Sequence, residues 1–268
     1  GFTFKKGLGQ NFLTARNILE EIVDAAEIES GVIEVGPGFG VLTSELAQNS
    51  DKVVTIEIDE RLIDVLDYTL AEYDNVKIIN EDILKLDLKK VIDDEFNGEK
   101  VSIAANLPYY ITTPIITKLL EEKLPIKNIV VMVQKEVAER MSAKPSTKDY
   151  GAITVLCQYY TEPSIVANVP ASLFVPPPKV DSAVLKLKVL DKPSVEVKDE
   201  GVFFRVVKAA FSQRRKTLLN CLSANFPIPK DEISTLLESI GIAPSRRGET
   251  LSLKEFANIA DTLLQKIK

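Results

Sequence analysis

The chain has 268 residues, of which 45% are hydrophobic and 27% charged, and its formal net charge is −6. Histidine is absent and cysteine occurs only as Cys157 and Cys221, which excludes histidine-based catalytic triads and a disulfide framework. No apolar run approaches the ~20 residues that a membrane-spanning helix needs, and the N-terminal residues lack the apolar core of a signal peptide. We therefore expect a reduced, cytoplasmic, globular protein.

Strand and helix patterns alternate over the first two thirds of the chain. Short runs rich in β-branched residues predict strands, and apolar residues at helical spacing predict the helices between them. Such alternation is typical of βαβ units and a mainly parallel sheet. The expected strands are 31–35, 52–59, 75–82, 100–108 and 126–134, and the expected helices are 61–73, 112–123 and 135–143.

The last third of the chain changes character. Two more strand patterns come close together in sequence, at 164–169 and 181–189, and can form an antiparallel pair. The polar segment 190–201 contains a proline and is typical of a linker. We therefore expect an α/β domain over residues 1–190 and a small all-α domain over residues 191–268. The helices expected in the second domain are 202–222, 230–241 and 252–267.

A glycine-rich turn follows the first predicted strand. The sequence EVGPGFG places Gly36, Gly38 and Gly40 where the backbone can turn sharply and approach a ligand closely. A simple tight turn is the alternative explanation. The pattern is not the dinucleotide fingerprint G-x-G-x-x-G, because Val41 stands at its last position.

Carboxylates follow the next two predicted strands. Glu57 can accept hydrogen bonds from both hydroxyls of a ribose, and Asp82 can accept one from an adenine amino group. Taken singly, each is better explained as a surface glutamate or a turn cap. Open α/β sheets bind ligands at the carboxyl ends of their strands, so the three features together favour a nucleoside.

The fourth predicted strand ends in NLPYY. Asn106 and the following carbonyl groups offer hydrogen-bond acceptors, Pro108 stiffens the turn, and Tyr109 offers a flat aromatic face. This set suits a heteroaromatic amine. The alternative, equally compatible with the residue types, is a polar turn beside a core tyrosine.

Cations gather at two places in this acidic chain. Lys5 and Lys6 lie near the start, and Arg214, Arg215 and Lys216 are contiguous in SQRRKT. The net charge argues weakly against a nucleic-acid partner, and a charge run is usually a solvated surface. Local clusters can nevertheless hold a phosphate backbone.

The motif NLPY resembles the signature of amino-group methyltransferases that use S-adenosylmethionine. With GLGQNFL, EVGPGFG, IEID, NED, FVPPPKVDSAV and FSQRRKTLLN, it is similar to the ribosomal RNA adenine dimethyltransferases over nearly the whole chain. The last two motifs favour the small-subunit branch of that family over the antibiotic-resistance enzymes. The resemblance implies a Rossmann-like class I methyltransferase with a mainly parallel seven-stranded sheet and a helical RNA-binding domain.

The resemblance also implies an activity and a set of site residues. The expected reaction is dimethylation of N6 on two adjacent adenosines near the 3′ end of small-subunit (16S) ribosomal RNA. The partner is then the small ribosomal subunit, and we expect a monomer without a metal that also contributes to subunit biogenesis. The catalytic turn comprises Asn106, Leu107, Pro108 and Tyr109, and the expected methyl-donor contacts are Asn11, Leu13, Gly36, Gly38, Glu57, Asp82 and Asn106.

Two further groups of residues are assigned to the RNA. Tyr109 and Phe174 are candidates for stacking on the target base, with a plain core position as the alternative for Phe174. The expected phosphate contacts are Lys5, Lys6, Arg214, Arg215 and Lys216.

Three alternatives to this activity stay open. The target can be an adenine of large-subunit RNA or of DNA. The chain can act mainly by binding, as a ribosome-assembly factor. It can also methylate a small molecule, although this would leave the basic C-terminal helices without a role.

Overall fold

The computed structural model describes residues 12–13 and 15–267 and divides the chain into two compact units. Unit 1 runs to Ala138 and resumes at Glu162–Val189; unit 2 comprises Glu139–Thr161 and the chain from Leu190 onward. A boundary near residue 190 was expected. The assignment of Glu139–Thr161 to the C-terminal unit was not, so both units are discontinuous in sequence.

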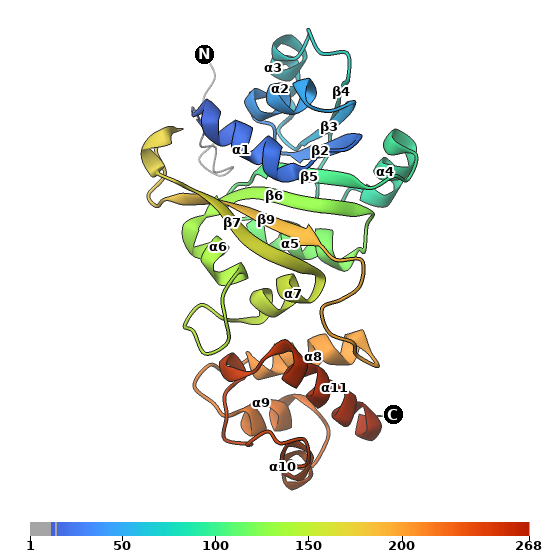
Figure 1. Cartoon of the computed structure of the whole chain (residues 1–268), viewed down its shortest axis with the longest axis vertical. Helices are drawn as coiled ribbons and strands as arrows, with labels where there is room; N and C mark the ends of the chain where they lie inside the picture. The colour runs from blue at the N-terminus through green and yellow to red at the C-terminus, as the bar shows by residue number, and fades with distance from the viewer. Residues whose placement is uncertain (1–11, 14, 268) are drawn as a thin grey trace. The chain divides into compact units, whose positions relative to one another are not determined.

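A seven-stranded sheet forms the centre of unit 1, in the order β4-β3-β2-β5-β6-β9-β7 (Figure 1). The four neighbouring pairs from β4 to β6 are parallel, and β9 is antiparallel to β6. The mainly parallel seven-stranded sheet predicted from the sequence is therefore confirmed. The strands are β2 (Gly31–Val35), β3 (Lys52–Glu57), β4 (Val76–Asn80), β5 (Val101–Asn106), β6 (Ile126–Gln134), β7 (Thr161–Val169) and β9 (Ser182–Val189).

The central strands are covered on both faces. All five residues of β2 and the first five of β5 are buried, as expected for a parallel sheet with helices on both sides. One of these helices, α1, buries Ile18, Leu19 and Ile22 on one face and packs against β5, β6 and β9. The helices that begin in unit 1 are α1 (Arg16–Ala26), α2 (Val41–Gln48), α3 (Ile63–Thr69), α4 (Leu88–Phe96), α5 (Thr112–Glu121) and α6 (Lys135–Met141).

Short strands β1 (Phe12–Leu13) and β8 (Phe174–Val175) form a separate antiparallel pair. Leu13 lies opposite Phe174, and both side chains belong to the hydrophobic cluster that also contains α1 residues. The FVPPPKVDS motif therefore begins in the core of unit 1.

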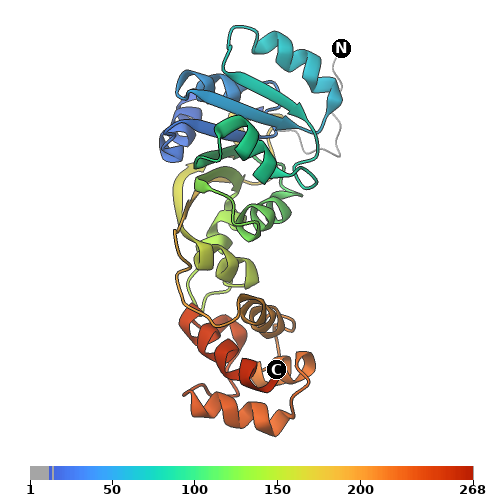
Figure 2. The ribbon, with the colours of Figure 1, turned by 90° about the vertical axis from the view of Figure 1, so that its right-hand side faces the viewer.

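Unit 2 is helical, and Figure 2 shows its C-terminal part, orange to red, as helices joined by loops. The single helix expected over 202–222 is wrong, because a turn at 211–217 divides it into α8 and α9. Residues 212–216 are exposed and polar, so they offer no apolar face to continue the helix, and Thr217 caps α9 by accepting the Asn220 N–H. The helices are α7 (Ala152–Tyr160), α8 (Glu200–Ala210), α9 (Leu218–Asn225), α10 (Lys230–Ser239) and α11 (Leu253–Ile267).

Aromatic packing explains why Glu139–Thr161 joins unit 2. Tyr150 and Tyr159 are buried in one cluster with Phe203 and Phe256. Tyr159 stacks on Phe203 with ring centroids 4.8 Å apart, and the Tyr150 hydroxyl donates to the Leu251 carbonyl at 2.8 Å. Buried aromatic rings contribute large apolar areas, so the segment containing α7 is bound to α8 and α11.

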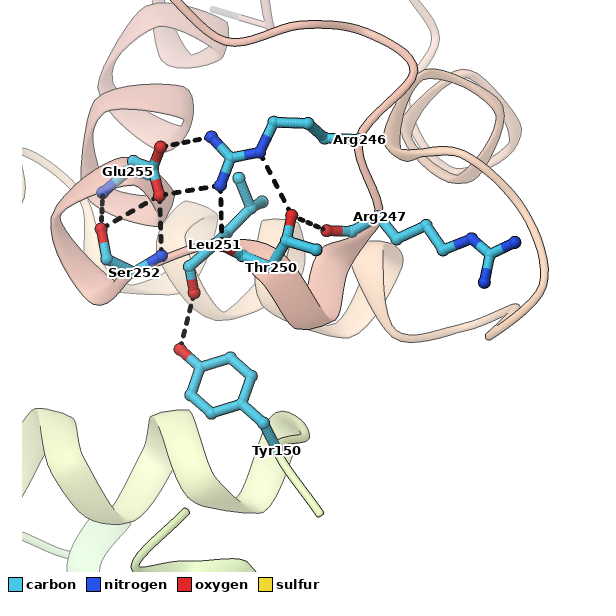
Figure 3. A network of polar contacts seen from close by, with 7 residues as sticks. All are labelled: Tyr150, Arg246, Arg247, Thr250, Leu251, Ser252 and Glu255. Atoms are coloured by element: carbon cyan, nitrogen blue, oxygen red, sulfur yellow. Dashed lines mark hydrogen bonds and ion pairs between the residues drawn. The ribbon is translucent and has the colours of Figure 1, made fainter. Parts of the chain in front are cut away.

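A polar network around Arg246 orders the start of α11 (Figure 3). The Arg246 guanidinium donates to the Thr250 hydroxyl at 3.1 Å, to the Thr250 carbonyl at 2.7 Å and to the Glu255 carboxylate. Burial raises the pKa of Glu255, but hydrogen bonds from Arg246 and Ser252 outweigh it and hold that pKa below its usual value. The Arg247 carbonyl accepts the Thr250 hydroxyl at 2.8 Å, but its side chain points away from the network in Figure 3 and is 54% exposed.

Adjacent arginines thus provide a matched test of this network. Arg246→Gln should lower the free energy of unfolding by about 2 kcal/mol, because a partly buried carboxylate loses its charged partner. Arg247→Gln should change it by less than about 0.5 kcal/mol, because that side chain is solvated. Urea unfolding of the full chain, followed by circular dichroism, measures both; equal losses in the two variants would contradict the assignment.

Candidate active site

One pocket in unit 1 opens at the carboxyl ends of β4, β3, β2 and β5. It brings together residues that the sequence analysis selected from five separate segments. Its described lining includes Leu13, Gly36, Gly38, Glu57, Asp82, Asn106, Leu107, Pro108 and Tyr109. The other predicted residues of the N-terminal segment, Lys5, Lys6 and Asn11, lie outside the described residues.

The glycine turn connects β2 to α2 in a conformation that favours glycine. Gly36, Gly38 and Gly40 have φ values of 70°, 59° and 83°, which side chains with a Cβ rarely adopt. The Gly36 N–H donates to the Ile56 carbonyl at 2.9 Å, which fixes the turn to the end of β3. A Cβ built on Gly36 would meet no atom within 4 Å, so the space beside its backbone is open to a ligand.

Glu57 ends β3 with its carboxylate buried beneath the glycine turn. Its Oε1 accepts the Asp59 N–H at 2.8 Å, and the carboxylate also accepts the Gly38 N–H. Burial raises the pKa of Glu57 and the nearby Asp59 carboxylate adds to the rise, while hydrogen bonds from the backbone of Asp59, Gly38 and Ile58 oppose it. Each carboxylate oxygen can accept more than one hydrogen bond, so these backbone bonds leave Glu57 able to accept from a ligand hydroxyl.

Asp82 caps a turn and also lines the pocket. Its Oδ1 accepts the Leu84 N–H at 2.9 Å and its carbonyl accepts the Lys85 N–H, so it caps the turn after β4. It also lines the pocket, with Oδ2 3.9 Å from the Lys85 Nζ. The capping bond orients the carboxylate without using both of its oxygens.

The turn after β5 is held by backbone bonds. The Leu107 N–H donates to the Met132 carbonyl in β6 at 3.2 Å. The Pro108 carbonyl accepts the Ile111 N–H and the Thr112 hydroxyl, both at 3.2 Å. The Pro108 carbonyl is therefore used within the turn, beside Asn106 and Leu107, which both line the pocket.

The two candidates for stacking occupy different environments. Tyr109 is partly buried and lines the pocket. Phe174 is 3% exposed and lies in the hydrophobic cluster with Leu13, outside the described pocket lining. The structure thus places the Phe174 ring in the core of unit 1, and its expected stacking role stays a prediction.

The SQRRKT cations lie in unit 2, in the turn between α8 and α9. Arg214, Arg215 and Lys216 are all exposed. Arg214 donates to the Lys148 carbonyl, so part of its guanidinium is used to join two loops of unit 2. Arg215 and Lys216 present their charge from the turn.

Several pocket residues were missed by the sequence analysis. Ile58 and Ile83 directly follow Glu57 and Asp82 and line the pocket, and Ile58 is 53% exposed. The sequence did contain a signal for these two residues, because an apolar side chain directly follows each strand-end carboxylate. Tyr110 also lines the pocket, whereas nothing in the sequence marked Glu34 as a pocket residue.

Chemically, the pocket is acidic. Its described lining contains the acidic residues Glu34, Glu57, Glu81 and Asp82 and no lysine or arginine, which favours a ligand carrying positive charge.

Across the described residues, no group of three or more metal-binding side chains is assembled. No helix in the described part of the chain is long and apolar enough to cross a membrane.

Glu34 is a buried acid in the middle of the sheet. It is 1% exposed, and its Oε2 accepts the Thr43 hydroxyl at 2.6 Å. Burial raises its pKa to about 7, although the bond from Thr43 opposes the rise. The folded chain therefore retains a proton on Glu34 that the unfolded chain, with its ordinary pKa near 4.5, loses.

The stability of the protein should consequently depend on pH through Glu34. Below pH 4.5, Glu34 is protonated in both the folded and the unfolded chain. As the pH rises from 4.5 to 7, the unfolded chain loses this proton first, so the free energy of unfolding falls by up to about 3 kcal/mol. Glu34→Gln should remove this contribution, so the difference in unfolding free energy between wild type and variant should change between pH 5 and pH 9. Urea unfolding across that range measures it, and a difference independent of pH would contradict the burial of an ionisable group here.

Comparison with known proteins agrees with this geometry. A family model described as ribosomal RNA adenine dimethylase matches residues 1–265. The ribosomal RNA small subunit methyltransferases A of Bacillus mycoides and Bacillus anthracis are each 56% identical to the chain over 270 residues, covering 98% of this chain and 92% of the relative.

Two solved structures of RNA-modifying enzymes are also similar to this chain over most of its length. A dimethyladenosine transferase from Plasmodium falciparum has a TM-score of 0.80 and 30% identity, covering 95% of this chain and 98% of that one. The 23S rRNA methyltransferase ErmE has a TM-score of 0.72 and 27% identity, covering 95% and 100%. From its sequence, its sheet and its pocket, the chain belongs to the ribosomal RNA adenine dimethylase family.

Proposed function

We propose that the protein transfers methyl groups from S-adenosylmethionine to N6 of two adjacent adenosines near the 3′ end of 16S ribosomal RNA, giving N6,N6-dimethyladenosine. Membership of the adenine dimethylase family supports the reaction. The 56% identity to small-subunit enzymes, against 27% to ErmE, supports a small-subunit target. The observation that carries the proposal is one pocket in which Glu57, Asp82 and Asn106 meet.

The residues of the pocket fit the methyl donor. The open space at Gly36 suits its methionine end, the remaining acceptor positions of Glu57 suit its ribose hydroxyls, and Asp82 suits the adenine amino group. Ile58 and Ile83 offer apolar surface for the two faces of the adenine. The acidic lining suits a sulfonium cation, which supplies an electrophilic methyl group.

The turn after β5 fits the methyl acceptor. The lone pair of an adenine amino group is delocalised into the ring, so the nitrogen is a weak nucleophile. Hydrogen bonds from its two N–H groups to the Asn106 side chain and the Leu107 carbonyl would favour a more tetrahedral nitrogen. The attack would break the sulfonium S–CH3 bond and leave a neutral thioether, and the cationic N6 would then lose a proton to water. Catalysis is mainly positioning and stabilisation of developing positive charge, which requires no histidine or other dedicated base.

The second methylation can use the same acceptors. A monomethylated adenine keeps one N–H, and Asn106 or Leu107 can accept it. The base must leave its stack to enter the pocket, and the Tyr109 ring at the rim is our candidate for stacking on it. Phe174 is the second candidate for stacking, and its ring is 3% exposed in the structure.

Unit 2 would hold the RNA. The exposed Arg215 and Lys216, together with Arg214 and the N-terminal Lys5 and Lys6, can contact phosphates. Because one chain carries both the pocket and these cations, we propose that it acts as a monomer. Its substrate would be the small-subunit particle in the cytoplasm. Binding of unit 2 to the particle would also give the protein a role in subunit biogenesis.

Asn106→Ala tests the catalytic turn. The variant should transfer labelled methyl from S-adenosylmethionine to unmodified small-subunit particles at least about 100-fold more slowly, because the amine loses an acceptor in the transition state. Binding to the particles, measured by co-sedimentation, should be unchanged. Transfer at the wild-type rate would refute the proposed role of Asn106.

The same assay discriminates between the alternative functions. Naked small-subunit RNA, large-subunit RNA and adenine-containing DNA serve as competing substrates, and the proposal requires preference for the small-subunit particle. If ribosome maturation proceeds normally in cells carrying Asn106→Ala, binding rather than methylation is the larger cellular role.

A pair of double variants tests the RNA contacts. Arg215→Gln combined with Lys216→Gln should weaken binding to the particle. Because two phosphate contacts are lost, the slope of the logarithm of the binding constant against the logarithm of the salt concentration should become less steep by about 1.5. Lys230→Gln combined with Lys254→Gln removes the same charge from other exposed positions of unit 2 and should have little effect. Similar weakening in both would show that only net charge matters.

A further inference from the structure

The C-terminal end of the FVPPPKVDS motif reaches the catalytic turn. Phe174 lies in the core, but Ser182, eight positions later, forms a hydrogen bond with the Tyr109 hydroxyl, with the two oxygens 2.8 Å apart. This bond joins residues 73 positions apart in sequence. It connects β9 to the turn after β5, and the proposed reaction gives the motif no other task.

Ser182 is a rigid attachment point. It is 0% exposed and begins β9, where it pairs with Gln134 of β6. The preceding Asp181 is fixed as well, because its carbonyl accepts the Lys135 N–H at 3.0 Å and its carboxylate accepts the Ala171 N–H at 2.9 Å. The serine side chain has a single rotatable bond to its oxygen, so a fixed backbone leaves its hydroxyl few positions.

Tyr109, by contrast, needs an attachment point of this kind to hold its ring in one orientation. It follows Pro108 in a turn rather than lying in a helix or strand, and its ring lines the pocket where a base would enter. Burial raises the pKa of Tyr109, the hydrogen bond with Ser182 opposes the rise and the nearby Asp181 carboxylate adds to it. The phenol therefore stays protonated at neutral pH and keeps its hydrogen-bonding hydroxyl.

We propose that Ser182 is a positioning residue, which fixes the orientation of the Tyr109 ring through this hydrogen bond so that the ring is ready to stack on the target adenine. The inference rests on the proposed role of Tyr109. Ser182 itself is outside the described pocket lining, so it acts on the base only through the tyrosine. It should affect the methylation step and leave the binding of the methyl donor unchanged.

The experiment compares Ser182→Ala, Tyr109→Phe and the double variant in single-turnover methylation of small-subunit particles. Each single change removes the same hydrogen bond, so each should slow methyl transfer about three- to tenfold. The double variant should be no slower than the singles, because the bond can be lost only once. The dissociation constant for S-adenosylmethionine should be unchanged in all three.

Ser102→Ala is the matched control for a structural effect. Ser102 is another buried strand serine, and its hydroxyl donates to the Ala26 carbonyl at 2.6 Å near the opposite end of β5 from Asn106. This variant should lose stability without a change in the rate of methyl transfer. If Ser182→Ala does not fold, Tyr109→Phe removes the bond from its partly exposed side, and an unchanged rate in that variant overturns the inference.

The outcomes separate this inference from the proposed function. If Tyr109→Ala methylates as fast as wild type, the role of Tyr109 in base binding fails. If Tyr109→Ala is slow but Ser182→Ala is as fast as Ser102→Ala, the base site stands and the positioning role of Ser182 is wrong. Additive losses in the double variant also overturn it, since they would mean that Ser182 acts independently of Tyr109.

Discussion

The site depends on the parallel arrangement of four neighbouring strands. Parallel strands deliver their carboxyl ends to one edge of a sheet, so the loops after β2, β3, β4 and β5 must converge although they are far apart in sequence. Each loop contributes one kind of group to the pocket: an open glycine turn, two carboxylates and an amide. No single loop contains enough chemistry to bind a nucleoside, whereas the shared edge does.

This arrangement has an energetic cost. Glu34 and Glu57 are both buried near the glycine turn, and burial raises the pKa of each. Glu57 is held by N–H groups of Asp59 and Gly38, while Glu34 is held by the Thr43 hydroxyl. The extensive apolar packing of the sheet and α1 stabilises the fold around these acids.

Much of unit 1 could be predicted because its sequence signals are local. Runs of β-branched residues mark the strands, and the strand order places Glu57, Asp82 and Asn106 at one edge. Other features depend on tertiary contacts. The turn at 211–217 interrupts residues with good helix propensity, and α8 ends where residues 212–216 are exposed and have no apolar surface to pack against. Likewise, the sequence around Phe174 does not say whether the ring faces the pocket or the core.

The most direct measurement is a structure of the full chain with S-adenosylhomocysteine, the demethylated form of the proposed donor. The ribose hydroxyls should lie on the Glu57 carboxylate, the adenine between Ile58 and Ile83, and the sulfur should face Asn106. A ligand bound elsewhere, or bound with its ribose away from Glu57, would contradict the assignment of the strand-end pocket as the methyl-donor site.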